Sequence, residues 1–316
     1  MIDRNKSLRN TLETVTEKEF DDLIKSKTPT VYCGFEVSGP VHLGTLIAAH
    51  KLLDFQVAGA KVKVLLADIH TRLNRKGDQS FIDQQIKYWE TVFKSIGLTE
   101  ADYVLGSSFQ FEKEYVCDVL ELAVNSTLNR ALRSMQEVAR DIENARVSQA
   151  IYPLMQIADI KALKADIAYG GMEQRKIHML ARELLPGVGG GKPVCIHTPL
   201  LVSLKGPGMK MSSSQPETLI KAQEKPDTLR QRINSAYCPK EKEGNPILQV
   251  CEHLLLPQMN VLEVERPEKY GGNLNYTDYI SLESDYLSGK LHPQDLKSAV
   301  AEGLVDLLEP VRRNLV

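Results

Sequence analysis

Residues 30–45, TVYCGFEVSGPVHLGT, join a predicted buried strand to a predicted helix through a turn rich in glycine. The apolar run TVYCGFE is typical of a strand, and the apolar residues after His42 recur with helical spacing up to Gly59. Backbone N–H groups and the helix dipole converge at such a turn, which favours a bound phosphate. Gly44 would let a ligand lie close to the helix, and His42 could donate a hydrogen bond to it. A purely structural turn accounts for this pattern equally well.

Strand and helix patterns alternate through much of the chain beyond this turn. The predicted strands are KVKVLLADI (61–69), DYVLGSSFQ (102–110), DIAYGG (166–171) and PVCIHTPLLVSL (193–204). The predicted helices between them include SFIDQQIKYWETVFKSIGL (80–98) and MEQRKIHMLAREL (172–184). This alternation indicates an α/β fold with a Rossmann-like, doubly wound parallel sheet.

Two stretches depart from the alternation. Residues 112–150 contain few strand formers and many charges, so we expect a helical insertion there. Beyond 215 we expect only helices and loops. We therefore predict an α/β domain over 1–215 and a smaller, mainly α-helical domain over 216–316. Residues 10–25 have the spacing of one amphipathic helix.

The composition is that of an ordinary globular protein, with 42% hydrophobic and 25% charged residues. The 39 basic and 41 acidic residues give no overall charge that would attract nucleic acid. The five cysteines form no CxxC pair and no zinc-like spacing, which predicts reduced thiols, a cytoplasmic location and no structural metal. The N-terminus lacks the apolar region of a signal peptide, and no apolar run is long enough to span a membrane.

The stretch YPLMQIADI (152–160) places Tyr152, Gln156 and Asp159 on one face of a predicted helix, with Pro153 in its first turn. A polar stripe is ordinarily the solvated face of a helix. A phenol, an amide and a carboxylate without lysine or glutamate are more typical of a pocket wall.

The stretch GMKMSSSQPE (208–217) has no helical or strand periodicity and predicts an exposed loop. Its lysine, Lys210, could neutralise charge on a phosphate, and its serines could bind phosphate oxygens. Taken alone, such a stretch is more often a plain surface linker.

These stretches together resemble a known family. Residues 42–45 (HLGT) and 210–214 (KMSSS) resemble the HIGH and KMSKS signatures of class I aminoacyl-tRNA synthetases. The segments YCGFE, YPLMQIAD, GGMEQRKIHMLARELLP, RPEKYGG and LHPQDLKSAVAE resemble tyrosyl-tRNA synthetases of the archaeal and eukaryotic type, over nearly the whole chain. Two positions depart from the signatures: Thr45 replaces the second histidine, and Ser213 replaces the second lysine.

The resemblance implies a Rossmann-like catalytic domain, a helical insertion that forms a homodimer contact and a helical anticodon-binding domain. It also implies that the enzyme activates L-tyrosine with ATP and Mg²⁺ and transfers it to tRNA(Tyr). His42, Lys210 and Ser213 are the implied catalytic residues. The implied ATP-binding residues are Gly34, His42, Gly44, Thr45, Lys210, Met211, Ser212, Ser213 and Ser214.

The resemblance implies further ligand contacts. Tyr32 and Asp159 would read the phenol of tyrosine. The amino group would be held by Tyr152, Gln156 and Gln174, with Glu36 beside the same ligand. The implied tRNA contacts are Arg175 and Lys176 on the acceptor stem, Tyr270 stacking on a base, Asp295 on a guanine edge, and His292 and Pro293 shaping that pocket.

Three other functions are considered. A tryptophanyl-tRNA synthetase would share the fold, but Tyr32 with Asp159 favours a phenol. An inactive paralogue that binds tRNA has its only support in Thr45 and Ser213. A small-molecule adenylyltransferase with a similar turn does not explain the residues beyond 215.

Overall fold

The computed structural model describes residues 2–138, 144–210 and 219–315. Its main sheet has six strands in the order β1-β6-β5-β2-β3-β4. Neighbouring strands are parallel except for the edge strand β1, which runs antiparallel to β6. The strands are β1 (Glu13–Val15), β2 (Thr30–Phe35), β3 (Lys61–Leu66), β4 (Asp102–Leu105), β5 (Ile167–Gly171) and β6 (Val194–Thr198). The predicted α/β, doubly wound sheet is confirmed.

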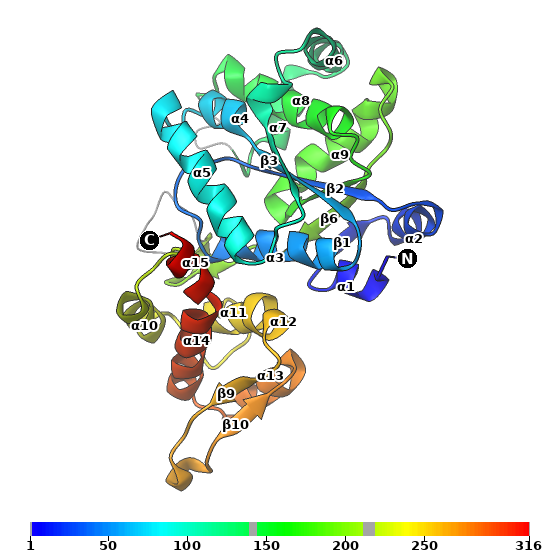
Figure 1. Cartoon of the computed structure of the whole chain (residues 1–316). Coiled ribbons are helices and arrows are strands. Elements are labelled where there is room, and N and C mark those ends of the chain that lie inside the picture. The colour runs from blue at the N-terminus through cyan, green and yellow to red at the C-terminus, as the bar shows by residue number, and fades with distance from the viewer. Residues whose placement is uncertain (1, 139–143, 211–218, 316) are drawn as a thin grey trace. The chain divides into compact units, whose positions relative to one another are not determined.

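The winding of the sheet changes direction between β2 and β5. From β2 the chain passes through α3 (Leu43–Val57) to β3 and through α5 (Gln79–Ser95) to β4. It then returns through α8 (Val147–Ala162) to β5, which pairs with the other edge of β2, and through α9 (Arg175–Leu184) to β6. Figure 1 shows α5 and α9 flanking the strands. In doubly wound sheets, ligands bind at the carboxyl ends of the strands where the order reverses, here beyond β2 and β5.

One hydrophobic core joins the strands to the helices of the return crossover. Tyr32 of β2 and Leu65 of β3 are buried together with Ile157 of α8 and Ile177 and Leu180 of α9. Because α8 and α9 bury their apolar faces here, their first turns and polar edges are held beside the strand ends.

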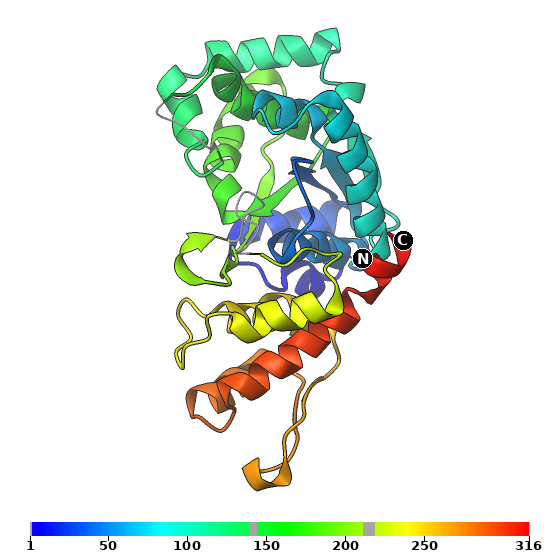
Figure 2. The same cartoon turned by 90° about the vertical axis from the view of Figure 1, so that its left-hand side faces the viewer.

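The described residues between β4 and α8 include helices and no strand. They form α6 (Lys113–Val124) and α7 (Leu128–Ser134), after the short helix η1 (Gly106–Ser108). In both views α6 stands at the margin of its part of the molecule (Figures 1 and 2). The expectation for Pro153 is wrong: α8 begins at Val147, so Pro153 lies inside the helix and not in its first turn.

The expected single helix over 10–25 is also wrong. The structure has α1 (Arg4–Leu8), then β1, then α2 (Glu17–Ser26). Thr16 and Glu19 form a capping box that starts α2, which explains why the helix cannot extend back through residues 13–15. Those residues pair with β6 instead.

The structure differs from two more of the predicted strand boundaries. Strand β3 ends at Leu66, and Asp68–Leu73 form α4. The predicted strand 193–204 divides into β6 and β7 (Val202–Ser203), and β7 pairs with β8 (Gly206–Lys210). Residues 208–210 are therefore a strand and not the predicted loop. Gly206 and Gly208 adopt positive φ values of 105° and 96°, which turn the chain through this short hairpin.

The C-terminal region contains a hairpin that the sequence did not predict. Strands β9 (Leu262–Val264) and β10 (Leu274–Tyr276) pair antiparallel, and η6 (Glu268–Tyr270) lies between them. The hairpin tip projects in both views (Figures 1 and 2). The other elements of the region are helical: α10 (Pro226–Ser235), α11 (Pro246–Val250), η5 (Cys251–Leu255), α12 (Leu256–Gln258), α13 (Tyr279–Leu287), α14 (Pro293–Leu307) and α15 (Glu309–Asn314).

The chain divides into two compact units. The first consists of residues 1–39, 51–90 and 97–199, and the second of residues 40–50, 91–96 and 200–316. Residues 200–215 group with the C-terminal region, so a catalytic domain that ends at 215 remains a prediction. No helix in the described ranges is both long and apolar enough to cross a membrane.

Candidate functional site

The first unit contains a buried polar cluster centred on Asp159 of α8, which is 0% exposed. Asp159 Oδ1 accepts hydrogen bonds from Gln110 Nε2 at 2.7 Å and from Tyr115 Oη at 2.8 Å. Its other oxygen, Oδ2, is buried and has no hydrogen-bond partner among the described residues. Burial raises the pKa of Asp159 to about 7, although the two donors oppose this shift. The cluster thus presents one unsatisfied carboxylate oxygen.

Tyr32 of β2 belongs to the same cluster and is 1% exposed. Burial, and then the nearby charge of Asp159, raises the pKa of the Tyr32 phenol well above its ordinary value. Gly34 follows two positions along the strand, on the same face. A Cβ at Gly34 would stand 2.9 Å from Tyr32 Oη, so glycine leaves the space that the hydroxyl occupies.

A second group of polar side chains follows the end of β2. Glu36 accepts a hydrogen bond from Asn74 Nδ2 at 2.8 Å and forms an ion pair with Lys76. Tyr152 of α8 lies near Glu36: burial, followed by the charge of Glu36, raises the pKa of this tyrosine well above its ordinary value.

The start of α9 joins the same polar face of α8. Gln156 Nε2 donates to Gln174 Oε1 at 3.0 Å. The structure therefore brings all six predicted tyrosine-binding residues into the first unit, with Asp159 and Tyr32 in one group and Glu36, Tyr152, Gln156 and Gln174 in the other.

The sequence analysis missed His70, Gln110 and Tyr115. The His70 ring packs edge-on against Tyr152, with centroids 4.6 Å apart, and its Nε2 lies 3.7 Å from Asp159 Oδ2. Burial lowers the pKa of His70 to about 4, so the ring is neutral at physiological pH. His70 and Gln110 come shortly after the carboxyl ends of β3 and β4, and that position could have identified them.

The first signature motif lies in the second unit. His42 forms a backbone bridge with Lys221, Leu43 N donates to Ile220 O at 3.1 Å, and Ala222 N donates to Val41 O at 2.8 Å. The segment just beyond the second signature is therefore paired with the first signature. This pairing joins Val41–Leu43 to Ile220–Ala222, although the two segments are far apart in sequence.

The His42 ring folds over the start of α3. Its Nδ1 accepts from Thr45 N at 3.4 Å, and a Cβ at Gly44 would stand 3.1 Å from His42 Cε1. A side chain at position 44 would therefore crowd the imidazole. Burial lowers the pKa of His42 to about 4, so the ring is neutral.

Lys210 is described only as the last residue of β8. The predictions for Met211, Ser212, Ser213 and Ser214 lie outside the described residues.

The two basic residues predicted to meet tRNA begin α9 in the first unit. Arg175 and Lys176 line a surface groove of about 390 Å³ together with Arg130 and Arg133 of α7. The sequence analysis missed the two arginines of α7.

The predicted anticodon residues occupy two places in the second unit. Tyr270 is 62% exposed near the hairpin tip, and Lys269 Nζ lies 4.8 Å from the centre of its ring. His292 caps α14, with Nδ1 accepting from Gln294 N at 3.1 Å, and Pro293 and Asp295 lie in the first turn. His292 therefore has a structural role whatever else it does.

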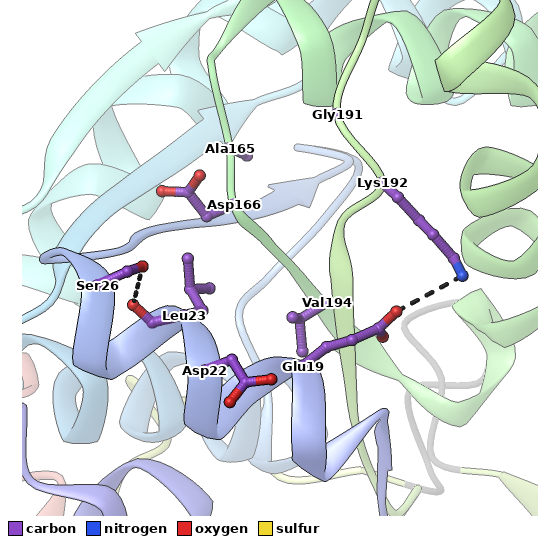
Figure 3. Close-up of a pocket in the computed structure, with 9 residues that line it drawn as sticks. All are labelled: Glu19, Asp22, Leu23, Ser26, Ala165, Asp166, Gly191, Lys192 and Val194. Atoms are coloured by element: carbon purple, nitrogen blue, oxygen red, sulfur yellow. Dashed lines mark hydrogen bonds and ion pairs between the residues drawn. The ribbon is translucent and has the colours of Figure 1, made fainter.

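A second surface groove, of about 460 Å³, lies in the first unit between α2 and the segments that lead into β5 and β6 (Figure 3). Asp22 in this groove is exposed, while Asp166 accepts from Thr30 N at 3.0 Å and from Lys27 Nζ at 2.6 Å. Glu19 is paired with Arg182 at 2.7 Å and Lys192 at 3.5 Å. The groove presents no unsatisfied group comparable to Asp159 Oδ2.

Comparisons with known proteins agree with this geometry. Residues 25–309 match the family described as tRNA synthetases class I (W and Y). A tyrosine–tRNA ligase of Methanospirillum hungatei is 48% identical over 308 residues, which cover 98% of this chain and 97% of that protein. One from Archaeoglobus fulgidus is 49% identical over 311 residues, covering 97% and 95% of the two chains.

A solved structure is similarly close. The crystal structure of an Archaeoglobus fulgidus tyrosyl-tRNA synthetase complexed with L-tyrosine has a TM-score of 0.95 and 47% identity, covering 99% of this chain and 98% of that one. The resemblance inferred from the sequence motifs is confirmed. The chain belongs to the archaeal-type tyrosyl-tRNA synthetases, within the class I family of tryptophanyl and tyrosyl enzymes.

Proposed function

We propose how the residues of this chain, a tyrosine–tRNA ligase by its family, divide the two steps of the reaction. In the first step a tyrosine carboxylate oxygen bonds to the α-phosphorus of ATP, and pyrophosphate leaves. In the second step a ribose hydroxyl of the terminal adenosine of tRNA(Tyr) attacks the activated carbonyl, and AMP leaves. The observation that carries the assignment is the unsatisfied Oδ2 of Asp159 beside Tyr32.

The phenol of the substrate donates to Asp159 Oδ2 and contacts the Tyr32 hydroxyl. Phenylalanine would fill the same space but leave the buried carboxylate oxygen unpaired. An unpaired buried charge is strongly unfavourable, and tyrosine-specific synthetases are themselves the standard example of this kind of selectivity.

The α-ammonium group of tyrosine lies among Tyr152, Gln156 and Gln174, with Glu36 nearby. This assignment is supported by the proximity of Gln156 to Gln174 and of Tyr152 to Glu36 in the first unit. They fix the carboxylate of the substrate in line with the α-phosphorus, because the reaction needs placement more than a protein acid or base.

ATP binds at the first signature. Because Nδ1 of the neutral His42 accepts from Thr45 N, the ring proton belongs on Nε2, which can donate to a phosphate oxygen. Gly34 and Gly44 are further ATP-binding residues in this proposal. Lys210, with Met211, Ser212, Ser213 and Ser214, stabilises the departing pyrophosphate, and Mg²⁺ arrives on ATP as part of the substrate.

Transfer RNA contacts both units. The acceptor stem meets the groove of Arg130, Arg133, Arg175 and Lys176. Their positive charges, of which Arg130 is paired with Glu183 in the same groove, suit phosphates. In the second unit Tyr270 stacks on an anticodon base, Asp295 accepts from a guanine edge, and His292 and Pro293 shape the site.

Two enzyme subunits associate through the helical insertion. On α6 the apolar side chains Val116, Leu120 and Val124 recur every fourth residue and are 42%, 61% and 80% exposed. An exposed apolar stripe of this kind is typical of an interface. Leu120→Glu should convert a homodimer to a monomer in light scattering, and an unchanged mass would refute this interface.

The five cysteines are free thiols, which supports a cytoplasmic location for this enzyme. The whole proposal is tested by charging purified tRNA(Tyr) with radiolabelled tyrosine, phenylalanine and tryptophan in parallel. Only tyrosine should be attached at an appreciable rate. Equal charging with phenylalanine would contradict the assignment of Asp159.

A further inference from the structure

Arg175 is held by a residue that the sequence places far away, Glu13 of the edge strand β1. Arg175 Nε donates to Glu13 Oε2 at 2.8 Å and to Oε1 at 3.0 Å, and Nη2 donates to Oε1 at 2.8 Å. The hydrogen bonds from Arg175 are the largest cause that lowers the pKa of Glu13 below its ordinary value. The carboxylate therefore binds the Nε–Nη2 edge of the guanidinium plane through both of its oxygens.

Glu13 is itself fixed by a buried pair of histidines. Strand register places Glu13 opposite His197 of β6, whose Nδ1 lies 3.0 Å from Glu13 Oε2. His197 Nε2 lies 2.9 Å from Nδ1 of His178, which belongs to the first turns of α9. Burial lowers the pKa of both rings, so they act as neutral hydrogen-bonding groups. The path Arg175–Glu13–His197–His178 starts and ends on α9, and it locks the orientation of Arg175.

The opposite edge of the guanidinium is available. Within the described residues, Arg175 Nη1 has no hydrogen-bond partner. The side chain is 42% exposed and lines the groove with Arg130, Arg133 and Lys176. An arginine held in one rotamer loses less conformational entropy when it binds a further ligand.

We propose that Glu13 is a positioning residue for tRNA charging: it orients Arg175 so that the Nη1 edge meets the acceptor stem. The inference rests on the proposed contact of Arg175 with tRNA. For the removal of Glu13, positioning and simple electrostatics predict opposite effects on tRNA binding. Removing the negative charge of Glu13 makes the groove more positive and would by itself strengthen binding of a polyanion. Positioning predicts the opposite, because Arg175 becomes free to adopt many rotamers.

The test uses the full-length enzyme with Glu13→Gln, Arg175→Ala and the double variant. We expect Glu13→Gln to lower kcat/KM for tRNA(Tyr) by about tenfold, the effect of one charge-assisted hydrogen bond that is lost or misplaced. Tyrosine-dependent pyrophosphate exchange, measured without tRNA, should stay at the wild-type rate. The double variant should be no worse than Arg175→Ala alone, because Glu13 acts only through Arg175.

Glu19→Gln is the matched control. Glu19 pairs with Arg182 on the same helix α9 at 2.7 Å and lines the groove in Figure 3. It should leave kcat/KM for tRNA unchanged. An equal loss in Glu13→Gln and Glu19→Gln would show that α9 is merely loosened, which would overturn the inference.

Two outcomes distinguish a failure of this inference from a failure of the proposed contact between Arg175 and the acceptor stem. If Arg175→Ala impairs charging and Glu13→Gln equals or exceeds wild type, positioning is refuted and the acceptor-stem contact stands. If Arg175→Ala leaves charging intact, the acceptor-stem assignment itself is wrong, and the inference falls with it.

Discussion

Replacing Asp159 with asparagine should make the ligand-free enzyme more stable at neutral pH and less selective for tyrosine. The substitution keeps the size of the side chain and an acceptor for Gln110 and Tyr115, but it removes a charge that is fully buried. The two effects have a common cause, because the charge that destabilises the empty site is the one that the phenol of tyrosine satisfies.

The effect on stability follows from the pKa of Asp159, which rises from 3.8 to about 7 on folding. A raised pKa means that the folded state binds the proton more tightly, so stability is greatest below pH 4 and decreases as the pH rises to 7. Three pKa units correspond to on the order of 4 kcal/mol. Asp68 adds to the upward shift, and His70, whose pKa is lowered to about 4, is neutral except at the acid end of this range.

Urea unfolding of the ligand-free enzymes, which measures the free energy of unfolding, tests this prediction. The free energy of unfolding of Asp159→Asn should exceed that of the wild type by an amount that grows between pH 4 and 7 and then stays constant. If the free energies of unfolding of the two enzymes decrease in parallel across that range, ionisation of Asp159 does not destabilise the folded state, and the reasoning is wrong.

The effect on selectivity is measured by pyrophosphate exchange at pH 8 with tyrosine and phenylalanine. Losing a hydrogen bond to a charged group costs about 1.5–3 kcal/mol, so kcat/KM for tyrosine should decrease by roughly 10- to 150-fold. The value for phenylalanine should decrease much less, because phenylalanine makes no such bond. An unchanged ratio of the two values would refute the phenol assignment even if the stability result held.

Three further predictions concern other parts of the enzyme. Lys210→Ala should slow adenylate formation in single-turnover experiments while the Kd for tyrosine barely changes, because a contact with pyrophosphate acts mainly in the transition state; equal losses in both would point to misfolding. Asp295→Ala should spare pyrophosphate exchange and reduce kcat/KM for tRNA by the roughly 1–3 kcal/mol of one base contact, and a variant that still rejects a transcript with a changed first anticodon base as strongly as wild type would disprove the contact. Gly170→Ala should weaken tyrosine binding in calorimetry, because the new Cβ would stand 2.8 Å from Gln174 Cγ and 3.3 Å from His178 Cε1; an unchanged affinity would mean that Gln174 does not hold the amino group.

Local sequence patterns predicted the residues whose neighbours are close in the chain. The turn from β2 into α3 was predicted because a strand, a glycine turn and a helix each leave a periodic signal of their own. Tyr152, Gln156 and Asp159 were assigned to one face because helical geometry relates residues three and four apart. The same reasoning failed at Glu13–Val15, because a strand of three residues is too short to produce a period. It also failed for β9 and β10, which are equally short.

The sequence by itself determined the alternating α/β fold, the signature at His42 and the polar face of α8, since each depends on the order and spacing of nearby residues. Only the tertiary structure decided which groups surround those residues. Asp159 accepts hydrogen bonds from Gln110, which precedes α6, and from Tyr115 of α6. Arg175 is bound by Glu13, which lies 162 positions away in the chain. No periodicity encodes such pairs. They arise because the sheet brings strand ends and edge strands together, and a buried charge must then be satisfied by whichever side chains the fold places beside it.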